Sequence, residues 1–338
     1  MSFSKRALTN TIYSGDLRVI GKAESYTTNS IGYDRILFAR PELYDLLFRQ
    51  IPPGKVHFSN KIVAFDQDSY GVTGTLGDNT AVRVDILVEL MVPTTMSVGY
   101  VSLLGTTDVL DPLKYPGVLK DDCETSFIIG DKNTPYTWAT FTVPGNKICW
   151  NVIIQLGLSS IADEDVGSAD WTTYGTMGDH FDVTQADRIS KVFFEDKLFQ
   201  TWNHGRVVLI GDGARAMSAM QDAVLLANHI YDILPIIHDN IEAALKEYKK
   251  ERFDAIKDQY PQSYISAQLV YGLTFYERVI RQIIFNWVPK SIQMKQLTKD
   301  TAYRPQSNFL PPAPRRGTVD IIPQRPSKRI QREELAMQ

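Results

Sequence analysis

The residues best suited to chemistry stand at a tight turn, Gly211-Asp212-Gly213, between an apolar run and a helical pattern. The run before the turn, Val207–Ile210, predicts a strand that is buried on both faces. From Ala219 the pattern is that of a helix. Glycine allows backbone torsions that other residues avoid, and open α/β sheets bind nucleotides at the carboxyl ends of buried strands, beside a helix start. The spacing therefore predicts a nucleotide site at this turn.

This segment resembles the second flavin-binding motif of the FAD-dependent aromatic hydroxylases, the class A flavoprotein monooxygenases. In that family a strand ends in Gly-Asp and a later helix opens with Asp-Ala, which Gly211-Asp212 and Asp222-Ala223 match. The intervening loop is shorter than the family's and lacks its His, Pro and Gly-Gln-Gly. Taken alone, Asp212 also fits an ordinary strand-end turn, and Asp222 fits a carboxylate stabilised by the helix macrodipole.

A second match lies in the first half of the chain. The segment ILFARPELYDLLFRQIP resembles the family's arginine-headed helix, which packs near the flavin. Arg40 matches that arginine, and the resemblance implies that its planar guanidinium donates to the phosphates or ribityl oxygens of FAD. Without the resemblance, an arginine at a helix start is a solvated charge. The implied cofactor residues are Arg40, Gly211, Asp212 and Gly213, with no metal ligand and no catalytic residue assigned.

Two cofactor motifs of the family are missing. The family opens with a strand–GxGxxG–helix unit, whose glycines let backbone amides approach a pyrophosphate, and this sequence contains no such motif. Its Ala-Asp-Gly motif is replaced around Glu89, Leu90 and Met91. We expect weak FAD binding or none, and an exposed apolar edge beside the Val207–Ile210 strand. A truncated or diverged relative, or an imperfect gene model, is indicated.

Composition excludes several other classes of protein. The 338 residues carry a net charge of −3, which gives no reason to expect nucleic acid as a partner. Cys123 and Cys149 stand far apart, and the spacing of the five histidines is not that of metal ligands. The first residues lack the apolar core of a secretory signal. We therefore expect an intracellular protein, either cytoplasmic or peripherally bound to a membrane.

The order of elements is strand-rich and then helix-rich, which predicts a mixed α/β fold. With the resemblance, this becomes an incomplete FAD/NAD(P)-binding Rossmann-like fold with an antiparallel substrate-domain sheet and a helical C-terminal region. The predicted division is 1–90, a partial FAD-binding domain; 91–200, the substrate-binding sheet; 201–300, the FAD-binding strand–turn–helix and C-terminal helices; and 301–338, a Pro-rich, basic, flexible tail.

Local patterns set the expected elements within this division. Helical patterns cover Pro41–Gln50, Gln185–Lys191, Asn240–Tyr260 and Ser263–Val288. A first meander of strands covers Lys55–Asn60, Lys61–Asp66, Tyr70–Leu76 and Ala81–Val88. A second meander covers Thr125–Gly130, Thr137–Val143 and Lys147–Gln155.

The long apolar segment Ser263–Val288 has two readings. Glu277, Arg278 and Arg281 interrupt it, which argues against a transmembrane span. A covering or dimer helix is the favoured reading. Peripheral membrane contact through 264–290 is the alternative, because Trp287 and neighbouring basic residues suit a lipid interface. The oligomeric state is left open.

The resemblance implies an FAD-dependent oxidoreductase that uses NAD(P)H and oxygen to hydroxylate or epoxidise an apolar or aromatic small molecule. In such enzymes the flavin carries most of the chemistry and the protein positions the substrate. The expected substrate position lies against the sheet, near Phe127–Ile129 and Trp138–Phe141. The alternative is a non-catalytic remnant or ligand-binding module that no longer holds FAD. The missing glycines favour that alternative, whereas the joint matches at Arg40, Gly211-Asp212 and Asp222-Ala223 favour descent from the enzyme.

Overall fold

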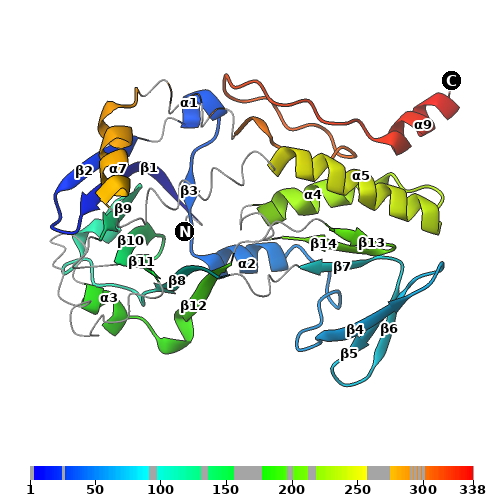
Figure 1. Cartoon of the computed structure of the whole chain (residues 1–338), viewed down its shortest axis with the longest axis horizontal. Coiled ribbons are helices and arrows are strands. Elements are labelled where there is room, and N and C mark those ends of the chain that lie inside the picture. The colour runs from blue at the N-terminus through cyan, green and yellow to red at the C-terminus, as the bar shows by residue number, and fades with distance from the viewer. Residues whose placement is uncertain are drawn as a thin grey trace.

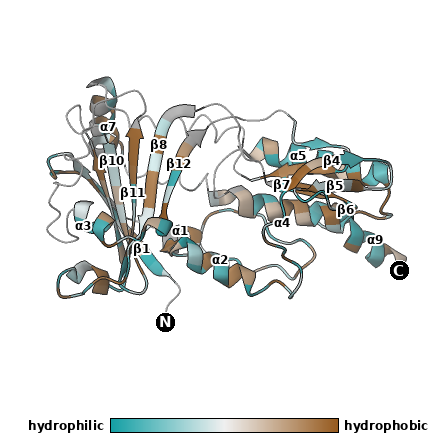
Figure 2. Cartoon of the chain, turned by 90° about the horizontal axis from the view of Figure 1, so that it is seen from below, coloured by the Kyte–Doolittle hydropathy of each residue, from teal (hydrophilic) through white to brown (hydrophobic). Residues whose placement is uncertain are grey.

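A large sheet forms one end of the molecule and a smaller α/β unit forms the other, in a computed structural model of the chain (Figure 1). The structure describes residues 4–24, 27–90, 97–130, 136–155, 177–195, 201–211, 218–256, 275–289, 292, 295, 298 and 301–337. Helix α2 (Arg40–Phe48) lies between the two ends in both views (Figures 1 and 2). The predicted mixed α/β fold is confirmed.

The large sheet is eight-stranded and follows the order β12-β8-β11-β10-β9-β1-β2, with β3 paired to β1. Its strands are β1 (Lys5–Ser14), β2 (Val19–Glu24), β3 (Ile36–Leu37), β8 (Ser97–Thr106), β9 (Cys123–Ile129), β10 (Tyr136–Val143), β11 (Lys147–Gln155) and β12 (Ile189–Glu195). The consecutive strands β9, β10 and β11 pair antiparallel, which confirms the second predicted meander. Strand β1 joins β9 in parallel.

Two stacked tryptophans form the centre of this sheet's core. The rings of Trp138 and Trp150 lie 5.8 Å apart and nearly parallel, and each side chain is 1% exposed. Phe181, from helix α3 (Met177–Asp182), packs edge-on against Trp150 at 4.7 Å. The indole N–H of Trp150 donates to Thr184 Oγ1 at 3.0 Å, so its polar atom is satisfied inside the core.

The smaller unit contains the predicted nucleotide-type strand. Strand β14 (Val207–Ile210) pairs in parallel with β7 (Leu87–Leu90) and antiparallel with β13 (Asn203–His204). Helices α4 (Ser218–Tyr231) and α5 (His238–Ile256) pack together over it. Their shared core consists of Val208, Leu225, Leu226, Ile241, Leu245 and Tyr248 with Trp202 and Ile233. The predicted strand and the predicted helices at these places are confirmed.

A second three-stranded sheet contains the first meander, with corrections. It is formed by β4 (Ile62–Gln67), β5 (Val72–Leu76) and β6 (Ala81–Val84), and the expected strand Lys55–Asn60 is a series of turns and bends. The run Ala81–Val88 is divided between β6 and β7. Buried Arg206 explains the break, because its guanidinium donates to Asp85 O at 3.0 Å and to Ser69 O at 2.6 Å.

The helix expected over Gln185–Lys191 is wrong. Only Ala186–Arg188 forms a 3₁₀ turn, and β12 begins at Ile189, opposite Gly105 of β8. Pairing with the edge of the large sheet outweighs a weak helical preference here. The other described helices are α1 (Thr27–Ile31), α7 (Phe275–Trp287) and α9 (Lys328–Ala336). In the described chain, no helix has the length and apolar character required to cross a membrane.

The segment 301–338, predicted as a flexible tail, makes hydrogen bonds and an ion pair with α4 in its described residues, and its flexibility stays a prediction. The described residues 301–337 pack along α4, whose buried polar side chains they satisfy. Asn228 donates to Gln306 O at 2.8 Å and accepts from Asn308 N–H at 3.0 Å. Arg325 forms an ion pair with Asp232 at 3.0 Å, and the Ser327 hydroxyl donates to Asp232 at 2.6 Å. Buried polar groups require such partners, and this requirement explains the contacts of a Pro-rich segment with α4.

Sheet pairing groups the first residues differently from the predicted division of the chain. Strands β1 and β2 lie in the large sheet with residues 97–195, whereas β4–β7 lie in the two small sheets. The four-part division itself stays a prediction.

Replacing Gly105 by alanine tests the packing of the large sheet. A Cβ at this position would lie 2.5 Å from Trp150 Cζ2. Because Trp150 is held by Trp138 and Phe181, we expect Gly105→Ala to lower the free energy of unfolding by about 1–3 kcal/mol. Gly77→Ala is the matched control, since its nearest contacts would be at 3.9 Å. Urea unfolding that shows equal stability for the two variants would contradict this packing.

Candidate active site

The carboxyl ends of β7 and β14 face the large sheet, and α2 begins on the same side (Figure 1). Gly211 follows β14 directly; it is buried and has a φ of 99°, a backbone conformation that strongly favours glycine. Its N–H donates to Asp222 Oδ2 at 2.9 Å. The turn expected after the strand therefore begins at Gly211. Asp212 and Gly213 lie outside the described residues, and their assignment stays a prediction.

Asp222 forms a buried ion pair with Arg252. The Nε of Arg252 donates to Asp222 Oδ1, and the two side chains are 1% and 4% exposed. Arg252 extends from α5 and Asp222 from α4, so the pair joins both helices to the Gly211 amide. Asp222 is therefore more than a helix-start carboxylate. A buried, hydrogen-bonded pair of this kind is strongly destabilised when one partner is removed.

Two tyrosines surround the pair and remain neutral. The Arg252 guanidinium lies 5.8 Å from the ring centre of Tyr303. Burial raises the pKa of Tyr303 to about 12 and also raises the pKa of Tyr248. Both hydroxyls stay protonated near neutral pH, so Asp222 is the negative charge in direct contact with Arg252.

Arg252 was absent from the predicted site, although the sequence holds a signal for it. Ile241, Leu245 and Tyr248 recur at helical spacing and are all fully buried. Arg252 comes four residues after Tyr248, so it continues the apolar stripe and must be buried with it. A charged residue on the buried face of a helix requires a partner of opposite charge.

Arg40 is exposed at the first residue of α2, and no hydrogen bond or ion pair to it is found within the described residues. The helix start lies against the large sheet. Burial raises the pKa of the Cys149 thiol, and the nearby Glu42 carboxylate adds to that rise. Helix α2 lies between the large sheet and the smaller unit (Figure 1), and the role of Arg40 at a cofactor stays a prediction.

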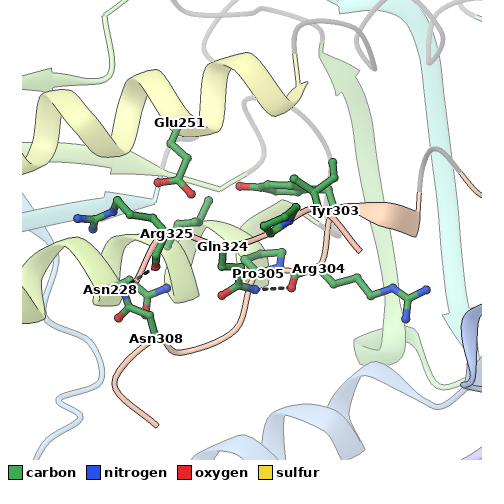
Figure 3. Close-up of a pocket in the computed structure, with 11 residues that line it drawn as sticks. Asn228, Glu251, Tyr303, Arg304, Pro305, Asn308, Gln324 and Arg325 are labelled. Carbon is green, nitrogen blue, oxygen red and sulfur yellow. Dashed lines mark hydrogen bonds between the residues drawn. The ribbon is translucent and has the colours of Figure 1, made fainter. Parts of the chain in front are cut away.

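A small pocket among the described residues lies elsewhere, between α4, α5 and the ordered tail. Its lining includes Asn228, Glu251, Tyr303 and Arg325, and Figure 3 shows their side chains around the strap of residues 303–325. The cavity volume is about 20 Å³, the space of about one water molecule. His229, next to it, pairs with Glu251 at 3.0 Å. The pocket holds structural polar contacts and is too small for a flavin.

A larger open groove lies at the opposite end of β14. Gln67, His204, His238 and Lys249 are among its lining residues, and its volume is about 640 Å³. Gly211 and the start of α2 lie away from it, so it is separate from the candidate site. Among the described residues, no group of His, Cys, Asp and Glu side chains has the arrangement to hold a metal ion.

Comparisons with known proteins agree with the fold. No family model matches the chain. The FAD-dependent monooxygenase penE of Penicillium thymicola is 30% identical over 138 residues, which is 36% of this chain and 29% of that protein. The FAD-dependent monooxygenase ausM of Emericella nidulans is 28% identical over 142 residues, 38% of this chain and 29% of that protein.

Solved structures extend the likeness to most of the chain. HpxO of Klebsiella pneumoniae, in complex with FAD and uric acid, has a TM-score of 0.69 at 16% identity. The match covers 89% of this chain and 81% of HpxO. The 2,6-dihydroxypyridine-3-hydroxylase of Arthrobacter nicotinovorans has a TM-score of 0.57 at 16% identity, over 81% of this chain and 78% of that enzyme.

The chain is similar in sequence to FAD-dependent monooxygenases over about a third of its length. It has their fold, and the match spans 29% of the length of the first curated relatives. In this chain β7 and β14 form a parallel pair. The Gly211 N–H donates to Asp222 of α4, which in turn accepts from Arg252 of α5. The opposite edge of β7 has no partner strand among the described residues.

Replacing Arg252 by methionine tests the ion pair at the site. We expect Arg252→Met to lower the free energy of unfolding by about 3–5 kcal/mol, because Asp222 stays buried without its counter-charge. The double variant with Asp222→Asn should lose less. Arg188→Met breaks an exposed ion pair with Asp108 of 2.7 Å and serves as the control, with an expected loss of about 0–1 kcal/mol. Equal losses for Arg252→Met and Arg188→Met in urea unfolding would contradict the assigned role.

Proposed function

We propose that this chain acts as an FAD-dependent monooxygenase, using NAD(P)H and oxygen to hydroxylate or epoxidise an apolar or aromatic small molecule. The observation that carries the proposal is the parallel pair β7–β14, whose carboxyl ends and Gly211 turn face the large sheet beside the start of α2. Open α/β sheets bind nucleotide cofactors at such ends. The names of the curated relatives support the same activity.

The described residues fit one side of an FAD site. Arg40 offers an unpaired guanidinium at a helix start, where anionic groups are favoured. Gly211 allows a close approach of the backbone, although its N–H is already donated to Asp222. The Gly-rich turn that would hold the pyrophosphate is absent from the sequence. FAD, held partly by Arg40, would supply the redox chemistry, and the protein would orient the substrate and shield it from water.

One face of the large sheet is suited to the substrate. Phe127 and Phe141 meet edge to face at 6.0 Å, and Phe141 pairs with Cys149, the residue close to Glu42 of α2. This face therefore lies toward the start of α2. Trp138 lies in the opposite core with Trp150 and is 1% exposed. Within the two segments predicted to lie near the substrate, Phe127–Ile129 and Trp138–Phe141, the side chains of Phe127 and Phe141 support that role and the side chain of Trp138 does not.

A polar group accompanies these aromatic residues. Arg35 Nη2 donates to Thr125 Oγ1 at 3.3 Å and to Asn10. Thr125 pairs directly with Phe141, so Arg35 lies beside the aromatic pair. A guanidinium next to an apolar surface suits a substrate with an aromatic or apolar body and one acceptor group, such as a hydroxyl or carbonyl.

The alternative, a non-catalytic remnant or ligand-binding module, is not favoured by the relatives. The unpaired edge of β7 and the missing Gly-rich turn are the observations on its side. Intracellular location, the absence of a nucleic-acid partner and peripheral membrane contact through 264–290 stay predictions.

The visible absorption spectrum of the purified chain with added FAD tests the function. We expect a bound-flavin spectrum that NADPH bleaches, and a weaker affinity in Arg40→Ala. Losing a hydrogen bond between charged groups costs about 1.5–3 kcal/mol, or roughly a tenfold to hundredfold rise in Kd. Arg49→Ala, at the other end of α2, is the matched control and should leave the Kd unchanged.

Three outcomes would count against the proposal. A folded, colourless protein that takes up no FAD would support the remnant. An equal effect of the Arg40 and Arg49 variants would remove Arg40 from the site. A flavin that binds but is bleached by neither NADPH nor NADH would exclude the nicotinamide as reductant.

A further inference from the structure

Helix α7 (Phe275–Trp287) presents an apolar face to solvent. Tyr276, Val279, Ile280, Ile283 and Trp287 recur every three or four residues and are between 39% and 81% exposed. At 3.6 residues per turn they form one narrow stripe along the helix. A surface helix normally turns its apolar stripe toward the core. The apolar stripe of α7 is turned outward.

The opposite side of α7 explains how the helix is held. Arg281 is 3% exposed, and Glu277, Ile284 and Val288 are partly buried. The helix packs against β2 at the outer end of the large sheet (Figure 1). Two charged and two apolar side chains therefore face the protein, while the described outward stripe carries no charge. Such a helix leaves its apolar stripe for another apolar surface.

The turn between β1 and β2 also exposes apolar residues. Leu17 is 37% exposed and Val19 is 61% exposed. They flank Arg18, which is paired with Asp16. Helix α7 contacts β2, the strand that follows this turn. We call the apolar stripe of α7 the α7 surface.

The dimensions of the α7 surface select its partner. Helix α7 has 13 residues, and at about 1.5 Å per residue it is roughly 20 Å long. With a width of about 10 Å, it offers on the order of 200 Å², well below the roughly 800 Å² that each partner buries in a stable protein interface. A membrane span needs about 20 apolar residues. The surface is too small for a stable dimer and too short to cross a bilayer.

We propose that the α7 surface lies in the plane of a lipid bilayer and holds the protein on the membrane peripherally. An amphipathic helix at such a surface buries its apolar stripe to the depth of the headgroup boundary. Tyr276 and Trp287 stand at its two ends, and these side chains favour the interface because a polar tip accompanies an apolar ring. The contact is independent of the flavin.

Vesicle binding tests this proposal. The probes are phosphatidylcholine vesicles and vesicles of phosphatidylcholine with phosphatidylglycerol, followed by co-sedimentation. Trp287 is 81% exposed, whereas Trp138, Trp150 and Trp202 are at most 4% exposed. The fifth tryptophan, Trp171, lies outside the described residues, so the emission of the unmodified chain is compared with that of Trp287→Phe to isolate the signal of Trp287. We expect the unmodified chain to sediment with vesicles and to show a blue shift of its emission. Trp287→Phe should lose the blue shift, and Ile283→Glu should lose the binding.

The variants separate the α7 surface from general stickiness. Ile283→Glu should weaken vesicle binding by about tenfold or more, because a carboxylate is poorly tolerated in an apolar layer. Leu113→Glu, at a residue 93% exposed in another loop, is the control and should bind as the unmodified chain does. Val279→Ser is a second, milder variant, and circular dichroism checks that each variant is folded.

Several results would overturn the proposal. Failure of the unmodified chain to bind either kind of vesicle is one, and binding that Ile283→Glu and Val279→Ser leave intact is another. A dimeric mass by light scattering that Ile283→Glu reduces to a monomer would show that a second copy covers α7. Both readouts are independent of FAD, so the result stands whether or not the protein is a monooxygenase.

Discussion

The buried pair of Asp222 and Arg252 is the interaction on which the smaller unit depends. Asp222 accepts from the Gly211 N–H at the end of β14 and from Arg252 on α5, so one carboxylate joins a strand and two helices. Removing either charge from this buried pair would leave the other without its counter-charge. The pair therefore fixes where β14 ends. The end of β14 decides where the turn at Gly211 begins. The buried pair therefore links the stability of the fold to the geometry of this turn.

The same unit is covered on one side only. Polar residues of α4, including Asn228 and Asp232, are buried under the ordered tail, whereas Met220 of the same helix is 55% exposed. Helix α2 has no buried residue, although Leu46, Leu47 and Phe48 are apolar. Val88, on the unpaired edge strand β7, is 41% exposed. An edge strand flanked by exposed apolar side chains is a surface suited to further pairing. Among the described residues, this edge of the smaller unit is therefore left without a covering strand.

Sequence patterns correctly predicted those helices and strands whose formation depends on residues within the element itself. The strand Val207–Ile210, the meander of β9 to β11 and helix α2 follow from apolar periodicity and turn residues. The errors arose where distant residues decide. Arg206 ends β6 by binding Asp85 O. The contacts of the Pro-rich segment with α4 were not predicted either, because they depend on the partners that Asn228 and Asp232 require. Gly211 and Arg40 were predicted as site residues from local motifs. Arg252 could be predicted only by inferring that the apolar stripe of α5, which it continues, is buried. Tertiary hydrogen bonds to side chains leave only weak traces in composition.

The alternation of side chains in the large sheet decides which aromatic residues can serve a substrate. Phe127 pairs with Ala139, whereas Trp138 pairs with Ile128, so the two sets point to opposite faces. Trp138 stacks on Trp150 in the core, and Gly105 leaves the room that Trp150 needs. Phe141 lies opposite Cys149, which is close to the start of α2. A one-residue shift in register would exchange the two faces. The tryptophan core therefore does more than stabilise the sheet, because it fixes the register that places Phe127 and Phe141 together on the opposite face.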